Sequence, residues 1–415
     1  MNKFTKFVFC LLAFVLGVGG GVGYAWYQTL PETEDLIIGE EVFYSYSDGE
    51  VSTADFENGN DVFSVHFLEL GNKYTGDCTY IKYGNTDILI DCGSRSNSVN
   101  AVSSYLNKYV SDNTLEFVIV THAHRDHYAG FATGVKADSI FDLYDCETII
   151  DFGNATNQDP NSTTYKNYVR ERTDEINAGA EYISAIECRN QDGTNMEFVI
   201  DEQNDVKFEV LYNEYTEYDY TNQETIGYKA HSENDYSVCT LFSVGEKKFI
   251  FTGDLESGEK DGEITEGGEE KLVKNNQSLI ALRDNGADHG VEVYKAGHHG
   301  SKTSSGTTLL NAIRPKHVGI CCCAGSDEYR AEPQNTFPTQ AFINRIAQYT
   351  NKVFVTTLCV DWQNSEYTSF NGNIVFWTKS SIQVVNVDCS NNEMILKDTD
   401  WFKENRTMPT EWQIS

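Results

Sequence analysis

Three histidines and one aspartate fall within six positions of a single segment. They are His122, His124, Asp126 and His127, and they directly follow the apolar stretch 115–120. The chain holds only nine histidines, so this cluster is far more specific than a surface loop that carries a lone histidine. Imidazole nitrogens and carboxylate oxygens bind Zn²⁺, Mn²⁺ or Fe, and such sites keep positions open for water. The segment therefore predicts a metal centre.

Three further segments end an apolar stretch on polar residues that could bind metal. Segment 88–93 ends around Asp91, and segment 249–254 ends on Asp254. Segment 293–302 ends on the pair His298 and His299, followed by Lys302. Each signal is weak alone, because an Asp and a Gly after a strand more often form a turn. Together they predict ligands gathered at one rim of a sheet.

The elements that must position these residues alternate along the chain. Period-2 and apolar patterns predict strands at 65–70, 78–82, 86–90, 115–120, 199–211 (a pair), 237–244, 248–252, 290–295, 317–323, 352–357 and 374–378. Helical spacing predicts helices near 96–110, 164–178, 270–285, 304–312 and 340–349. Strands that alternate with helices over this length indicate a layered α/β domain.

The ordered set of segments resembles the metallo-β-lactamase superfamily. More narrowly, it resembles the C-terminal hydrolase-like domain of ComEC-type DNA-uptake channel proteins and the free-standing relatives of that domain. The resemblance covers residues 62–388, and the channel is absent, because no stretch beyond residue 27 is long and apolar enough to span a membrane. It implies an α/β fold, the αββα sandwich of two mixed β-sheets flanked by helices.

The resemblance also implies two divalent metal ions, zinc or manganese, and their ligands. The implied ligands are His122, His124, Asp126, His127, Asp254 and His298. The histidines at 122 and 124 would hold the first metal, and Asp254 would bridge the two. Asp126, His127 and His298 would hold the second metal.

Catalytic roles follow for residues around the same centre. Asp126 could orient the nucleophile as well as bind metal, and Lys302 could contact a phosphate oxygen or lie exposed on the surface. His299 could contact substrate or replace His298 as the ligand. Asp91 would orient the histidine segment by hydrogen bonding, the support that metal ligands usually need.

Two segments depart from the pattern of the superfamily. Where many members supply a third histidine to the first metal, this chain has the segment 234–237, and His231 lies just before it as an alternative ligand. ComEC-like relatives also tend to lack that histidine. The second departure is segment 329–335, where relatives tend to carry a Tyr-Gly-His-Pro-like stretch. A histidine that could contact substrate is therefore missing.

These features predict a metal-dependent hydrolase, first of all a phosphodiesterase or nuclease-like enzyme. The formal charge of −32 argues against a long nucleic-acid track but leaves room for a small phosphodiester or a short strand. One alternative is an acyl, lactam or thioester hydrolase, although the missing third histidine counts against a true β-lactamase. Another is a noncatalytic surface-binding module, against which the complete ligand set counts.

The first residues of the chain have the features of a targeting segment. Lys3 and Lys6 precede an apolar run, and residues 1–27 are expected to be a signal peptide or membrane anchor. The protein is then exported, and is extracellular or anchored to the outer face of the membrane by this segment alone. Residues 28–60 are expected as an acidic linker, 61–400 as the domain with a polar insertion at about 155–235, and 401–415 as a tail. The eleven cysteines form no evident framework, and they are expected to be mostly small buried side chains, with one or two disulfides as the alternative in an exported protein.

Overall fold

The computed structural model describes residues 42–46, 51–53, 55–57, 59–134, 137–153, 162–188, 190, 194–213, 216–219, 224–227, 232–260, 262–284, 289–328, 332 and 335–413. Residues 42–415 form one compact unit. The leader expected at 1–27 and the alternative ligand His231 lie outside the described residues.

The first sheet has ten strands in the order β2-β1-β22-β21-β3-β4-β5-β6-β7-β8. Their bounds are β1 Val42–Ser45, β2 Val51–Thr53, β3 Val62–Phe67, β4 Thr79–Tyr83, β5 Thr86–Ile90, β6 Thr114–Val120, β7 Asp145–Asp151, β8 Glu181–Ser184, β21 Ile374–Lys379 and β22 Asn386–Cys389. Strands β5 to β8 run parallel to one another, and the other neighbours pair antiparallel.

The second sheet has eight strands in the order β20-β19-β18-β17-β14-β13-β10-β9. Their bounds are β9 Glu197–Asp201, β10 Val206–Tyr212, β13 Cys239–Val244, β14 Lys247–Phe251, β17 Val291–Lys295, β18 Pro315–Ala324, β19 Val353–Asp361 and β20 Glu366–Ser369. The four strands β14, β17, β18 and β19 are parallel neighbours, and the rest pair antiparallel. Two small hairpins stand apart, β11 (Thr216–Asp219) with β12 (Glu224–Gly227) and β15 (Glu259–Lys260) with β16 (Glu263–Ile264).

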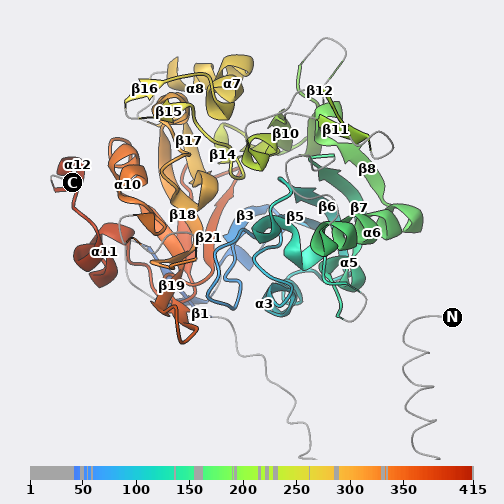
Figure 1. Ribbon diagram of the computed structural model, residues 1–415, viewed down its shortest axis with the longest axis horizontal. Coiled ribbons are helices and arrows are strands. Elements are labelled where there is room, and N and C mark those ends of the chain that lie inside the picture. The colour runs from blue at the N-terminus through green and yellow to red at the C-terminus, as the bar shows by residue number, and fades with distance from the viewer. Residues whose placement is uncertain are drawn as a thin grey trace, which may run out of the picture. The chain divides into compact units, whose positions relative to one another are not determined.

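Helices accompany both sheets. Their bounds are α3 Ser98–Leu106, α4 Arg125–Tyr128, α5 Ile140–Leu143, α6 Thr163–Ala178, α7 Gly268–Asn275, α8 Gln277–Asp284, α9 Thr307–Ile313, α10 Gln340–Ile346, α11 Asp400–Asn405 and α12 Thr410–Gln413. Helices α5 and α6 contact β7 of the first sheet, and Figure 1 shows α7, α8 and α10 on the side of the second sheet.

The two sheets meet through an aromatic interface. The ring of Phe63 on β3 lies 5.0 Å from that of Phe249 on β14, and Phe67 lies 6.3 Å from Phe251. On β18, Gly319 leaves space for the Phe67 ring, because a Cβ at this position would lie 2.1 Å from Phe67 Cε2. Two mixed sheets packed face to face, with helices outside, confirm the predicted αββα sandwich.

The structure extends the domain at both ends beyond the expected bounds. Within the stretch expected as a linker, β1 and β2 join the first sheet, because Phe43 is fully buried and its ring lies 5.0 Å from that of Phe56. Within the expected tail, Trp412 is 3% exposed and its ring lies 5.6 Å from that of Phe402. Burying these large rings against the domain stabilises both segments, which are otherwise largely polar.

Two further findings concern membrane-spanning helices and the cysteines. Among the described residues, no helix combines the length and the apolar character that a bilayer crossing requires. The ten cysteines that the structure describes are free thiols, and nine of them are buried.

Candidate metal centre

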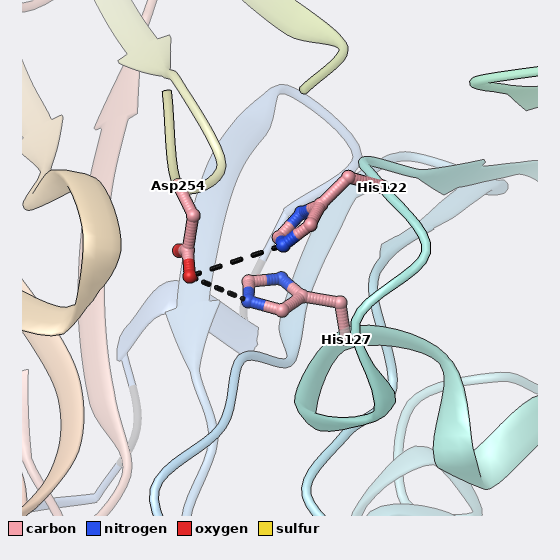
Figure 2. A group of neighbouring side chains, drawn as sticks. All are labelled: His122, His127 and Asp254. Atoms are coloured by element: carbon pink, nitrogen blue, oxygen red, sulfur yellow. Dashed lines mark ion pairs between the residues drawn. The ribbon is translucent and has the colours of Figure 1, made fainter. Parts of the chain in front are cut away.

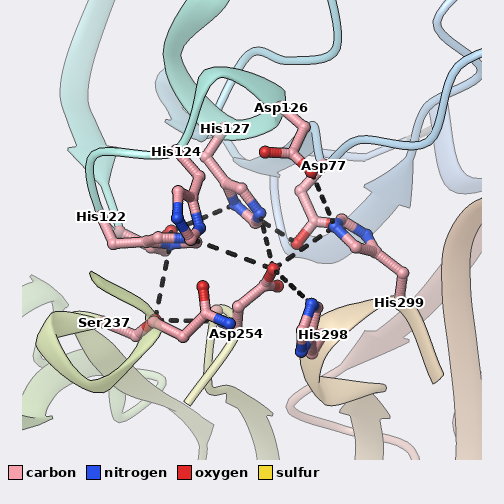
Figure 3. Close-up of polar contacts among 12 residues, drawn as sticks. Asp77, His122, His124, Asp126, His127, Ser237, Asp254, His298 and His299 are labelled. Carbon is pink, nitrogen blue, oxygen red and sulfur yellow. Dashed lines mark hydrogen bonds and ion pairs between the residues drawn. The ribbon is translucent and has the colours of Figure 1, made fainter. Parts of the chain in front are cut away.

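The candidate ligands gather where two pairs of parallel strands end. Strands β5 and β6 are parallel neighbours in the first sheet, and β14 and β17 are parallel neighbours in the second. Asp91 follows β5, the histidine segment follows β6, Asp254 follows β14, and His298 follows β17. Because parallel strands share one carboxyl edge, these side chains converge at one rim, and Figure 3 shows the labelled histidines gathered around Asp254.

Asp91 holds the histidine segment by three short contacts. Its Oδ1 accepts a hydrogen bond from the Thr121 backbone N–H at 2.8 Å, and its Oδ2 accepts one from Thr121 Oγ1 at 2.7 Å. The same Oδ2 lies 2.7 Å from His127 Nδ1. This contact leaves His127 Nε2 facing the opposite way, so Asp91 has the orienting position expected of it.

Asp254 lies at the centre of the histidines. Its Oδ2 is 3.2 Å from His127 Nε2 and 3.9 Å from His122 Nε2 (Figure 2). These three residues offer ligand atoms within 4.8 Å of one another. His124 joins the group through its Nδ1, which lies 3.0 Å from His122 Nε2. One oxygen of Asp254 is thus shared by side chains from both sheets, as a bridging carboxylate requires.

The paired histidines after β17 differ in where they point. His299 is fully buried, and its Nε2 lies 3.5 Å from Asp126 Oδ2 and 3.4 Å from Asp254 Oδ2. Asp126, His127 and His299 form a second group with ligand atoms within 4.8 Å. The His298 side chain is 21% exposed, and its Nε2 lies 3.8 Å from Asp254 Oδ2. The geometry therefore brings His299 rather than His298 to Asp126 and His127.

An unusual backbone conformation separates these two rings. His298 and His299 have φ values of 47° and 54°, in the left-handed region that non-glycine residues rarely adopt. The backbone N–H of His298 donates to the Gly253 carbonyl at 3.1 Å, which ties this turn to the segment that carries Asp254. Residues held this way cluster at functional sites.

Asp77 and Lys295 also belong to the centre, although the sequence analysis gave them no role. Asp77 is 2% exposed, forms a buried ion pair with Lys295, and has its Oδ1 3.0 Å from His299 Nδ1. The Asp77 backbone N–H donates to the Asp126 carbonyl at 3.0 Å. A lysine that ends the otherwise buried strand β17 is the one local signal for this pair, because a buried ammonium group needs a carboxylate partner.

Burial and neighbouring charges set the protonation of the cluster in opposite directions. Burial would raise the pKa of Asp254, but the charges of His127 and His299 outweigh it and hold the pKa well below its ordinary value. Burial lowers the pKa of His122 well below its ordinary value, which keeps that ring neutral and able to bind a metal. Burial would also lower the pKa of His299, but Asp254 and Asp77 raise it to about 10.

Several buried polar atoms at this point make no well-aligned hydrogen bond within the described part of the chain, although two of them lie 3.2 and 3.4 Å from Asp254 Oδ2. They are Nε2 of His127, Nε2 of His299 and Oδ1 of Asp254. Leaving buried polar groups unsatisfied costs roughly 1–3 kcal/mol each, so three of them around one point call for a ligand. Nitrogen and carboxylate donors in this mixture fit Zn²⁺ or Mn²⁺.

Lys302 does not reach the same pocket. The site opens into a pocket of about 290 Å³ lined by Arg95, His124, Arg125, Asp126, Asp254, His298 and Glu328. Lys302 is exposed and lines a different cavity, of about 620 Å³. Glu256 also lines that cavity, and its Oε1 lies 3.5 Å from His298 Nδ1. Lys302 and the candidate metal ligands therefore line different pockets, with His298 and Glu256 between them. The expected contact of Lys302 with substrate stays a prediction.

The segment 234–237 brings a hydroxyl where the superfamily that the sequence resembles often has a histidine. Ser237 is fully buried, and its Oγ accepts a hydrogen bond from the Asp254 backbone N–H at 3.0 Å. The same Oγ lies 3.5 Å from His122 Nδ1. Ser237 therefore positions the Asp254 carboxylate and lies beside the His122 ring.

A family model described as the metallo-β-lactamase superfamily matches residues 71–139. This range contains Asp77, Asp91 and the whole histidine segment. The matched range lies in a sandwich of two mixed sheets whose rim carries the remaining ligand candidates. The chain has the metallo-β-lactamase fold.

Several solved structures are similar to this chain at low sequence identity. The metallo-β-lactamase fold protein YhfI from Bacillus subtilis has a TM-score of 0.38 and 12% identity, over 77% of this chain and 100% of that chain. Human tRNase Z, short form, has a TM-score of 0.32 and 12% identity, over 70% and 93%. Yeast PDE1 has a TM-score of 0.36 and 10% identity, over 73% and 91%. A search of the curated proteins finds no match.

Proposed function

We propose that this protein is a metal-dependent hydrolase that cleaves phosphodiesters with a metal-activated water. The observation that carries the proposal is the set of buried, unsatisfied ligand atoms of His127, His299 and Asp254 around one point. Such atoms are stabilised when cations bind between them, and the site opens directly into a pocket that a substrate can enter.

The residues divide into two ligand sets that share Asp254. His122 and His124 would hold the first ion, and their side chains touch through Nε2 and Nδ1 at 3.0 Å. Asp126, His127 and His299 would hold the second, in agreement with their mutual proximity. This assignment gives His299 the ligand role and leaves His298 to face the substrate pocket.

Metal ions held by these residues would lower the pKa of a bound water towards neutrality and would stabilise negative charge on the reacting group. The remaining steps belong to side chains of this chain. Asp91 and Ser237 keep the histidines and Asp254 in position through the contacts described above. His298 lines the pocket and could pass a proton to the leaving oxygen through its Nε2, while Thr303 Oγ1 lies 3.2 Å from its Nδ1 and fixes the ring.

An anionic substrate is favoured over a neutral acyl compound by the cations at the pocket. Two arginines, Arg95 and Arg125, line the same pocket as His124 and Asp126, and Arg95 is paired with Glu328 at 2.6 Å, which leaves Arg125 as the cation for an anionic group. Guanidinium groups recognise phosphate oxygens well. Acyl, lactam and thioester hydrolysis remain the alternative chemistry for the same metal centre, and the noncatalytic alternative corresponds to metal binding without turnover.

The test is turnover by the full chain, stripped of metal and reloaded with Zn²⁺ or Mn²⁺. Substrates are bis(p-nitrophenyl) phosphate, p-nitrophenyl acetate and a chromogenic cephalosporin. We expect turnover of the phosphodiester, abolished by chelator and reduced at least about 100-fold in His127→Ala, since a ligand is lost. His289→Ala is the control, because His289 pairs with Glu292 away from the site. Turnover of the acyl substrates alone would replace this proposal by acyl hydrolysis, and binding without any turnover would overturn it.

We also propose that the protein acts outside the cell membrane, either free or anchored by its first residues. The support is the basic start at Lys3 and Lys6 and the apolar run that follows. A link with DNA uptake rests on the ComEC-like resemblance alone and stays a prediction.

A further inference from the structure

The substrate pocket contains two guanidinium groups with different surroundings. Arg95 follows β5 on the loop after Asp91, and Arg125 is the first residue of α4, between His124 and Asp126. Both line the pocket of about 290 Å³ together with four of the candidate metal-site residues. The question is which of the two is available to a ligand.

Arg95 is fully committed to the protein. Its Nη2 donates to Glu328 Oε1 at 2.6 Å, and its Nη1 donates to the Ser94 carbonyl at 2.7 Å. Its guanidinium also stacks over the Tyr74 ring, 3.9 Å from the ring centroid. Glu328 in turn accepts a hydrogen bond from the Thr75 backbone N–H at 2.9 Å. Arg95 therefore shapes the wall of the pocket, and Glu328 neutralises its charge.

Arg125 makes none of these kinds of contact within the described residues. In that part of the chain, the Arg125 guanidinium makes no hydrogen bond, ion pair or ring contact, and the residue is exposed. An arginine without a partner on an open surface is ordinary, but this one lines a concave pocket beside ligands that Asp91 and Ser237 hold in place. The chain carries twice as many acidic as basic residues, 63 against 31, so acidic partners are abundant elsewhere.

We propose that Arg125 is the specificity-determining residue of this pocket and binds a second anionic group of the substrate, beyond the group that reacts. The inference rests on the proposed phosphodiesterase function and names its substrate class, which is a small phosphodiester that also carries a terminal phosphate. A planar guanidinium with five donors matches a terminal phosphate, whose charge exceeds that of the diester. The pocket volume of about 290 Å³ suits a nucleotide-sized molecule rather than a long strand.

Binding of two thymidine nucleotides that contain no diester bond separates Arg125 from catalysis. Thymidine 3′,5′-bisphosphate carries two phosphates, and thymidine 3′-monophosphate carries one. Calorimetry on the zinc-loaded full chain gives both dissociation constants. We expect the bisphosphate to bind wild type roughly 10- to 100-fold more tightly than the monophosphate, the range for a charge-assisted hydrogen-bonded pair.

Three variants give this comparison its controls. Arg125→Gln should bind both nucleotides equally, and Arg125→Lys should keep part of the preference, because it retains the charge without the fork. Arg170→Gln removes one positive charge on α6, where Arg170 bonds Asn167, and should behave as wild type. Zinc content and circular dichroism are measured on each variant to show that the fold and the centre are intact.

The outcomes separate this inference from the proposed function. An equal bisphosphate-to-monophosphate ratio in wild type and Arg125→Gln would overturn the role of Arg125, whether or not the protein turns over diesters. Kinetics on the dinucleotide TpT and its 5′-phosphorylated form pTpT complete the test. If both are cleaved, kcat/KM should favour pTpT only when Arg125 is present. If neither these dinucleotides nor bis(p-nitrophenyl) phosphate is cleaved, the proposed function fails, and the nucleotide-binding ratios still decide the role of Arg125.

Discussion

At the residue scale, the centre depends on side chains that do not themselves bind metal. Asp91 contacts His127 Nδ1 and both donors of Thr121, and Asp77 occupies the corresponding position on His299 Nδ1. Asp91 fixes the direction of His127 Nε2, and the Cys321 carbonyl, which lies 2.9 Å from His299 Nδ1 beside Asp77, fixes that of His299 Nε2. Such outer partners determine ligand orientation and basicity.

Replacing Asp91 by asparagine keeps the volume but removes the acceptor oxygen that faces His127. We predict that Asp91→Asn weakens metal affinity roughly 10- to 100-fold, because the His127 tautomer is no longer fixed. Competition with a chromophoric zinc chelator measures the affinity. Unchanged affinity in a folded variant would remove Asp91 from the ligand support.

His66 lies away from the centre and gives a pH-dependent stability. It is fully buried, with Nδ1 2.7 Å from Tyr105 Oη and Nε2 2.7 Å from Ser64 Oγ. Burial lowers the pKa of His66 from 6.5 to about 3. Between these values the unfolded chain binds a proton that the folded chain excludes. The stabilisation is therefore complete above pH 6.5 and is lost as the pH falls towards 3.

We predict that the free energy of unfolding falls by about 2 kcal/mol, through His66 alone, when the pH is lowered from 7.5 to 5. Urea denaturation of wild type and His66→Gln at both values measures it. The destabilisation caused by the substitution should shrink by that amount at pH 5. A difference between the two proteins that does not change with pH would mean that His66 titrates normally in the fold.

At the element scale, much of the candidate site could be predicted because its ligands follow strands. The histidine segment, Asp91 and Asp254 each come directly after an apolar strand, and short-range patterns reveal such strands. The choice between His298 and His299 could not be made, because it depends on two residues with positive φ that decide which ring turns inward. Asp77 was missed because no regular pattern precedes it and its ion-pair partner Lys295 is 218 positions away.

The packing of one strand against the other sheet also depends on a single glycine. We predict that Gly319→Ala costs about 1–3 kcal/mol, because its Cβ would lie 2.1 Å from Phe67 Cε2 and the well-packed interface must shift. Urea denaturation measures the loss. A second substitution, Phe67→Leu, removes the atoms that collide, so Gly319→Ala should cost less in that background than in wild type. Strict additivity of the two changes would show that this contact does not limit the approach of the sheets.

At the scale of the whole molecule, the charge of −32 opposes the arrival of an anionic substrate. The alternation of strands and helices along the sequence predicts a layered α/β domain. The sequence does not predict that both ends of the domain pack against it. Phe56 and Trp412 stand between polar residues in the sequence, Phe43 lies in a run of only three apolar residues, and only the three-dimensional neighbours show that all three are buried.

Added salt should therefore raise kcat/KM for an anionic substrate. We predict that kcat/KM for bis(p-nitrophenyl) phosphate rises as ionic strength increases from about 10 mM to 150 mM, because the Debye length falls to about 8 Å and screens the distant carboxylates. The uncharged ester p-nitrophenyl acetate is the control for general salt effects. A rate that falls with salt would mean that local cations, with Arg125 first, dominate the approach of the substrate.

The most direct test of the central claim joins metal content and turnover in one titration. Metal-free full chain is titrated with Zn²⁺ or Mn²⁺ while bound metal per chain and bis(p-nitrophenyl) phosphate hydrolysis are measured together, for wild type and Asp254→Ala. We predict two ions per wild-type chain, with activity that requires both, and a loss of about 100-fold or more in Asp254→Ala. Two bound ions without hydrolysis of any phosphodiester, or hydrolysis that persists in the metal-free protein, would contradict the account.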